Sequence, residues 1–206
     1  MSSSCCEEKS CDLEQIRDSH SRVLKIVLAV NLVMFVVEFA FGLLARSTAL
    51  MGDSLDMLGD ATVYAMSLYV VTRSLRIKAK VTLVKGAIMV LLGLIVLAEA
   101  IRTVLSDVLP VSETMGWIGT VALGANAFCL WLLTRHKNDD LNMRSVWICS
   151  RNDIIANVSV LVAALLVGTL QSQWPDVIVG SIISLLFLGS GLSVFRGALK
   201  TLSPQN

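Results

Sequence analysis

Six long apolar runs constrain the fold of this chain more than any other feature. Crossing the apolar core of a bilayer, about 30 Å thick, takes about 20 helical residues, and each run approaches that length. Hydrophobic residues make up 55% of the 206 positions, too many for a soluble domain of this size. We therefore predict an all-α membrane protein with six transmembrane helices, at residues 26–45, 48–71, 86–105, 116–133, 146–168 and 177–195.

Lysine and arginine residues alternate between the two sides of the predicted bundle. They are frequent before the first run, after the second, after the fourth and after the sixth, whereas the opposite side has Arg46 and Arg102 near it. Positive residues in short loops stay on the cytoplasmic side of a membrane. We therefore expect both termini to be cytoplasmic. The first run is interpreted as a span and not as a cleaved signal, because five more runs follow it.

The chain divides into a tail, a membrane domain and a short end. Residues 1–22 are predicted to be a flexible cytoplasmic tail, residues 23–200 a six-helix transmembrane domain, and residues 201–206 a short C-terminal tail. Short loops offer no grip for nucleic acid or protein-sized substrates, so no such partner is expected.

Three tail thiols, Cys5, Cys6 and Cys11, lie beside two carboxylates. A cytoplasmic location keeps thiols reduced. The irregular spacing leaves two alternatives open: an arm that captures metal ions, or a tail without a binding role.

Carboxylates recur inside two of the apolar runs, where they are costly. In "DSLDMLGD", Asp53, Asp56 and Asp60 are three and four residues apart, so they lie on one helical face. In the fifth run, Asp153 and Asn157 are four apart. Each pattern predicts a polar stripe that faces the bundle interior.

The depths of the two stripes are similar. Counted from the outer end of the second run, Asp56 lies roughly 12 Å deep and Asp60 roughly 18 Å deep. Counted across the fifth run, Asn157 lies roughly 14 Å and Asp153 roughly 20 Å from the outer face. Four oxygen-bearing side chains would then meet near the midplane.

Up to three negative charges at one level repel one another, and a divalent cation or protons would relieve that repulsion. A site shared by two rocking helices opens to either side in turn, as in alternating access. The alternative is that the acids are protonated, hydrogen-bonded fixtures that hold the helices together.

These residues resemble the cation diffusion facilitator family, whose members exchange divalent metal ions for protons. The resemblance covers most of the membrane portion. Besides "DSLDMLGD" it includes the first-run segment "NLVMFVVEFAFGLLARSTALMGDS", with Asn31, Glu38 and Gly42 on one face, "EAI" in the third run, Asn126 in the fourth and Asp176 at the start of the sixth.

The family's transport site pairs residues four apart on the second and fifth helices. Carried over, the implied metal ligands are Asp56, Asp60, Asp153 and Asn157, with Asp53 and Cys149 as weaker candidates. None of the four positions carries histidine, unlike the zinc-type pattern. An oxygen-only shell suits harder ions such as manganese or ferrous iron, and Cys149 would add one soft ligand. Clustered aspartates would then have to carry the protons.

The resemblance implies a proton-coupled exporter of zinc-, cadmium-, cobalt-, iron- or manganese-type ions in a bacterial inner membrane. Such a secondary transporter is not an enzyme, and no cofactor is expected beyond the transported metal and protons. For Glu38 and Asn31 we favour structural roles over proton transfer. The chain is expected to be a short form without the family's C-terminal cytoplasmic domain. A homodimer would then have to form through the membrane helices, and small residues in the sixth run would permit it.

Two other functions remain open from the sequence. A member that has lost transport would be a metal-binding sensor or scaffold, and the amide at position 157 fits that hypothesis. An intramembrane aspartyl protease would also need aspartates on two helices, but its two-carboxylate chemistry needs neither the second-run triplet nor the amide.

Overall fold

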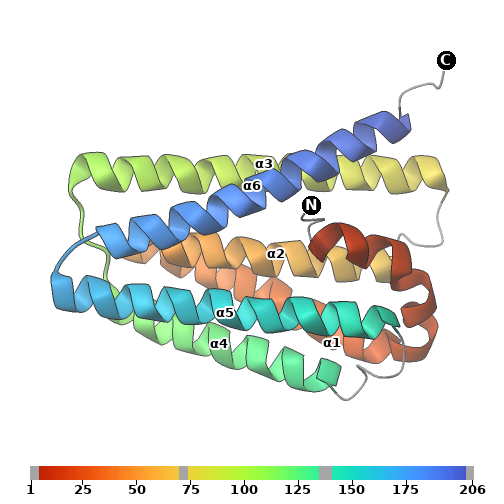
Figure 1. Ribbon diagram of the computed structural model, residues 1–206, viewed down its shortest axis with the longest axis horizontal. Helices are drawn as coiled ribbons and strands as arrows, with labels where there is room; N and C mark the ends of the chain where they lie inside the picture. The colour runs from red at the N-terminus through yellow and green to blue at the C-terminus, as the bar shows by residue number, and fades with distance from the viewer. Residues whose placement is uncertain (1–4, 70–73, 135–140, 203–206) are drawn as a thin grey trace.

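The structure is a computed structural model that describes the backbone of residues 5–69, 74–134 and 141–202. Within these ranges the side chains of residues 5–21, 67, 69, 75 and 141–152 are not described. The described part is a bundle of six helices (Figure 1). They are α1 (Cys5–Ala45), α2 (Thr48–Tyr69), α3 (Leu75–Ser106), α4 (Ser112–Thr134), α5 (Leu141–Leu170) and α6 (Trp174–Leu202). The predicted all-helical fold is confirmed.

Several helices extend beyond the predicted apolar runs. α1 begins at Cys5, within the residues 1–22 assigned to a flexible tail from the sequence, and α3 begins at Leu75 and not at residue 86. No glycine or proline occurs before Gly42, or between Leu75 and Lys85. Because nothing in these segments opposes helix formation, the polar residues continue the helices past the apolar runs.

Consecutive helices run in opposite directions, so the bundle has two distinct ends. At one end, which we call the turn end, α1, α3 and α5 stop at residues with positive φ, namely Arg46 (55°), Asp107 (48°) and Gln171 (48°). The left-handed conformation at each position ends the helix and allows a short turn. The described lysines and arginines at the starts of α1 and α3 and the end of α6 lie at the opposite end.

α2 lies in the middle of the bundle and packs against α1, α3, α5 and α6. α3 is paired mainly with α6, which crosses it along the upper side of Figure 1, while α4 packs against α5 and α1. Most of α2 is therefore shielded by other helices. Its three aspartates are carried by the helix that is best covered by protein.

The surface of the bundle is apolar and its interior holds polar groups. Large side chains such as Leu44, Leu105 and Leu186 are 75%, 80% and 69% exposed. Glu38 and Asp53 are in contrast 0% and 1% exposed. This distribution is the reverse of that in a water-soluble domain, where charged residues are rarely fully buried.

Five of the described helices contain a segment that is long and apolar enough to cross a membrane, judged by length and composition. These segments are Arg22–Ala45, Arg76–Ser106, Ser112–Thr134, Asp153–Leu170 and Trp174–Leu202. α2 is not among them, because three aspartates fall within its 22 residues. The predicted membrane character is supported, and the count of six spans stays a prediction.

Asp176 of α6 holds the beginning of α2. Its Oδ1 accepts hydrogen bonds from Ser47 Oγ at 2.6 Å and Ala49 N at 3.0 Å, and its Oδ2 accepts from Thr48 N and Oγ1, both at 2.8 Å. Ser47 Oγ in turn accepts from Leu50 N. The first N–H groups of a helix lack intrahelical partners and carry partial positive charge. A fully buried carboxylate from another helix satisfies both needs.

Glycines set the spacing between α6 and its neighbours. A Cβ added at Gly180 would collide with the Thr48 backbone and lie 2.7 Å from Ala49 N, and one at Gly191 would lie 2.9 Å from Met89 Cβ. Gly180 and Gly191 therefore allow close helix packing within the chain. Gly189 and Gly197 have no atom within 4 Å of an added Cβ, so these two glycines of α6 face open space.

Replacing Gly180 by alanine should separate α2 from α6. We expect Gly180→Ala to lower the free energy of unfolding by about 1–3 kcal/mol, because the backbone of α2 would have to move. The measurement is thermal unfolding in detergent. Gly189→Ala is the matched control on the same helix, and equal stability of the two variants would contradict the packing described.

Removal of the Asp176 carboxylate should destabilise the start of α2. Asp176→Ala leaves several buried donors without an acceptor, each costing about 1–3 kcal/mol, so we expect a larger loss of stability than for Gly180→Ala. Thermal unfolding measures it, with Glu113→Ala, an exposed acid in the first turn of α4, as the control. A melting temperature unchanged from wild type would refute the cap.

Candidate functional site

Polar side chains from four helices meet at two levels of the bundle interior. The level nearer the turn end, which we call the amide layer, consists of Glu38, Asp53, Asn126 and Asn157. The other level, which we call the thiol layer, consists of Asn31, Asp60, Cys129 and Asp153. Each layer takes one residue from each of α1, α2, α4 and α5. The two layer residues of one helix are seven apart in α1 and in α2, about 10 Å along a helix, and three and four apart in α4 and α5, about 5–6 Å.

The amide layer is organised around Asn157. Its Nδ2 donates to both carboxylate oxygens of Asp53, at 3.0 and 2.9 Å, and its Oδ1 accepts from Asn126 Nδ2 at 3.2 Å. Asp53 and Asn157 are each 1% exposed. The amide of Asn157 is thus fully engaged by neighbours. From spacing alone, the sequence predicts Asn157 opposite Asp56. That position is one helical turn away from Asp53, the aspartate that Asn157 binds.

Glu38 completes the amide layer from α1. It is fully buried, and no described N–H or hydroxyl group donates a hydrogen bond to either carboxylate oxygen. Its carboxyl group lies within hydrogen-bonding reach of the Asp53 carboxyl and near that of Asp56. A carboxylate in such a place is costly unless something compensates its charge. The structural role that the sequence favours for Glu38 stays a prediction.

The thiol layer surrounds Cys129 of α4, with Asp60 from α2 and Asp153 from α5 near it. Both aspartates lie within electrostatic range of the buried Cys129 thiol. Asn31 Nδ2 approaches Cys129 Sγ at 3.9 Å, and Tyr64 Oη donates to Asp60 Oδ2 at 3.4 Å. The sequence predicts no role for Cys129. Its position three residues after Asn126, on the same face of the helix, was the pattern that could have indicated one.

The four predicted ligands are distributed over both layers and do not converge. Asp60 and Asp153 belong to the thiol layer, Asn157 to the amide layer, and Asp56 is partly exposed between them. Among the residues whose side chains are described, no three His, Cys, Asp or Glu side chains are close enough to hold a metal ion. Cys149 and the tail cysteines Cys5, Cys6 and Cys11 are outside the described side chains. The ligand set therefore stays a prediction.

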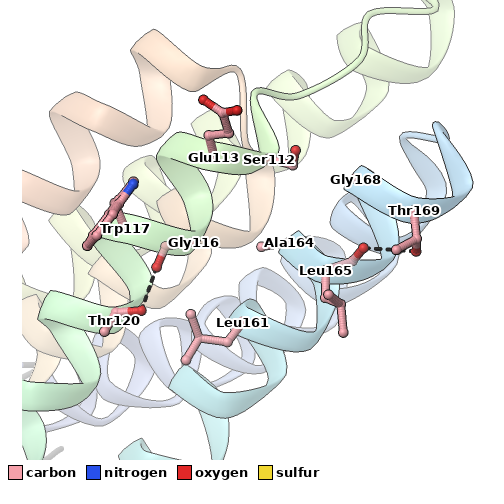
Figure 2. Close-up of a pocket in the computed structure, with 10 residues that line it drawn as sticks. All are labelled: Ser112, Glu113, Gly116, Trp117, Thr120, Leu161, Ala164, Leu165, Gly168 and Thr169. Atoms are coloured by element: carbon pink, nitrogen blue, oxygen red, sulfur yellow. Dashed lines mark hydrogen bonds between the residues drawn. The ribbon is translucent and has the colours of Figure 1, made fainter.

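A groove in the described part of the chain lies away from both layers. It has a volume of about 520 Å³ and runs between the turn-end halves of α4 and α5 (Figure 2). Trp117 and Leu165 on its walls are 75% and 66% exposed, and Thr120 and Thr169 direct their hydroxyls to carbonyls of their own helices. No predicted ligand lines this groove. Its exposed apolar walls belong to the outer surface of the bundle and not to the acidic interior.

An apolar exterior around buried acids and amides defines a polytopic membrane protein with ionisable groups in its interior. Residues 24–203 match the cation efflux transmembrane domain. The chain belongs to this family. It is therefore an integral, multi-pass protein, and its bacterial relatives place it in an inner membrane.

The relatives are bacterial transporters. The chain is 26% identical over 201 residues to the zinc transporter ZitB of Yersinia pestis, and this alignment covers 90% of the chain and 64% of the relative. It is 24% identical over 203 residues to a cadmium, cobalt and zinc/H(+)-K(+) antiporter of Bacillus subtilis, covering 88% and 65%. With the metal cation efflux system protein CzcD of Cupriavidus metallidurans it shares 23% identity over 197 residues, covering 89% and 62%. The chain spans less than two thirds of the length of each of these relatives.

The Asn157 bonds can be tested directly. Asn157→Leu keeps an apolar side chain of similar size but leaves Asp53 without its two donors, so we expect a loss of about 3 kcal/mol in unfolding free energy. Ser159→Ala is the matched control on α5, because the Ser159 hydroxyl donates to the Ile155 carbonyl of its own helix. Indistinguishable thermal unfolding of the two variants would contradict the network.

Proposed function

We propose that this chain moves divalent metal cations out of the cytoplasm in exchange for protons, through a site formed by α2 and α5. The observation that carries the proposal is that Asp60 of α2 and Asp153 of α5 both lie within electrostatic range of the same buried thiol, that of Cys129. Membership in the cation efflux family and the names of the relatives support metal as the substrate.

All six helices cross the membrane in this proposal. The three aspartates of α2 keep it from being recognised as a span by composition. Its length of 22 residues is nevertheless sufficient to cross a bilayer, and the neighbouring helices shield its acids from lipid. Arg46 and Arg102 lie near the turn end, whereas the described lysines and arginines at the starts of α1 and α3 and at the end of α6 lie at the end of the bundle opposite the turns. By the positive-inside rule, that end is cytoplasmic, and with an even number of spans both termini lie there.

Metal binding would require α2 and α5 to move relative to each other, because their acids do not converge in the conformation described. Asp56, Asp60 and Asp153 remain the proposed ligands. For the fourth position, Asn157 is engaged by Asp53 and Asn126, which favours Cys149, four residues before Asp153 in α5. Protons would replace the metal on the same aspartates, because metal ligands must be deprotonated to bind.

The test is metal uptake into inverted vesicles driven by a pH gradient. We expect Asp60→Asn and Asp153→Asn each to reduce the flux of zinc, cadmium and manganese at least tenfold, because each substitution removes one charged ligand. Glu113→Gln, the same kind of change at an exposed position of α4, should retain wild-type flux. Flux that persists in both aspartate variants would refute the proposed site.

The same assay separates transport from the sensor hypothesis. A wild-type chain that binds metal but shows no flux in any vesicle preparation would be a sensor or scaffold. Metal selectivity is resolved by Cys149→Ser, which should impair cadmium more than manganese if the thiol is a ligand, since thiolates prefer soft ions. The protease hypothesis gains no support from membership in a transporter family.

A further inference from the structure

Among the described acids, Glu38 has the surroundings that least account for its complete burial. Its side chain is 0% exposed, and both of its oxygens lack a hydrogen-bond donor among the described residues. Asp53, its neighbour from α2, is nearly as buried but accepts two hydrogen bonds. The two acids lie side by side, and the neighbour that acts on both of them, Asp56, is a third carboxylate.

Two buried carboxylates side by side repel each other, and each also loses its hydration. Asn157 compensates Asp53 by dipole alone, because an amide brings no positive charge. Asn126 uses its Nδ2 on Asn157, and no described residue donates to its Oδ1. The amide layer therefore presents oxygens from Glu38, Asp53 and Asn126, together with up to two negative charges.

From this arrangement we infer that the amide layer is a second divalent-cation site, with Glu38 and Asp53 as its charged ligands. It is distinct from the proposed transport site at the thiol layer and lies nearer the turn end. Two carboxylates balance the charge of one divalent ion. A set of carboxylate and amide oxygens without sulfur or imidazole suits hard ions such as manganese, magnesium or calcium.

The separation of the layers follows from the helices that carry them. Asn31 and Glu38 are seven residues apart in α1, and so are Asp53 and Asp60 in α2, which corresponds to about 10 Å. The layer residues of α4 and α5 are three and four apart, which corresponds to about 5–6 Å. Asp56 lies between the two layers on α2 and is partly exposed. An ion leaving the thiol layer toward the turn end passes Asp56 and then meets Glu38 and Asp53. The position of this second site along a transport path rests on the proposed function, whereas cation binding at Glu38 and Asp53 does not.

The experiment counts Mn²⁺ ions bound to the full chain in lipid nanodiscs by electron paramagnetic resonance. We expect two ions per wild-type chain. Glu38→Gln and Asp60→Asn should each leave one, and the double variant should leave none. Glu113→Gln is the control for loss of an acid outside the bundle interior and should retain two.

A second measurement needs no substitution in the site. Two Mn²⁺ ions within about 10 Å of each other broaden each other's spectrum, so the fully loaded wild type should show dipolar broadening that disappears in Glu38→Gln. Thermal unfolding of Glu38→Gln verifies that the variant is folded. One bound ion in the wild type, or two in Glu38→Gln, would overturn the inference.

Failure of this inference is distinguishable from failure of the proposed function. If vesicle flux depends on Asp60 while the wild type binds a single ion, transport stands and the second site falls. If two ions bind and Glu38→Gln removes one, but no flux is seen, the second site stands and the transport proposal falls.

Discussion

A polar group inside a bilayer cannot be hydrated, and this constraint organises the interior of the protein. Every described helix that carries a buried acid or amide turns it toward another helix, while leucines and valines cover the outside. The result is the amide and thiol layers, in which α1, α2, α4 and α5 each contribute one residue per layer. Polar contacts therefore specify how these four helices face one another, because burial of apolar surface provides little driving force between helices in lipid.

α2 shows the constraint most clearly. It has three aspartates in eight residues, so it is poorly suited to contact lipid, and the other helices enclose it. Asp176 holds its first turn through four hydrogen bonds, and Gly180 allows α6 to approach its backbone. These contacts fix the depth of α2 relative to α6, and with it the levels of Asp53 and Asp60. The distant residue Asp176 thereby positions the acids without touching them.

The depth estimate from the sequence pairs Asp153 with Asp60 and Asn157 with Asp56. Asp60 and Asp153 both lie within electrostatic range of Cys129, and their shared depth stays a prediction. Asn157 bonds to Asp53 and not to Asp56. Helix tilt and the extension of α5 to Leu170, beyond the predicted end at residue 168, were invisible to a count of residues. Partner choice within a polar stripe depends on rotation about the helix axis, which spacing does not specify.

By itself, the sequence determined the number and type of elements, the membrane character, the family and the helices that carry the acids. Those properties depend on the length, hydropathy and spacing of residues within each helix, which are local. The tertiary structure decided which polar residues meet: the pairing of Asn157 with Asp53, the capping of α2 by Asp176 and the placement of Glu38 beside Asp53. These contacts join residues as far apart as 129 positions in the chain, and their formation depends on how whole helices pack.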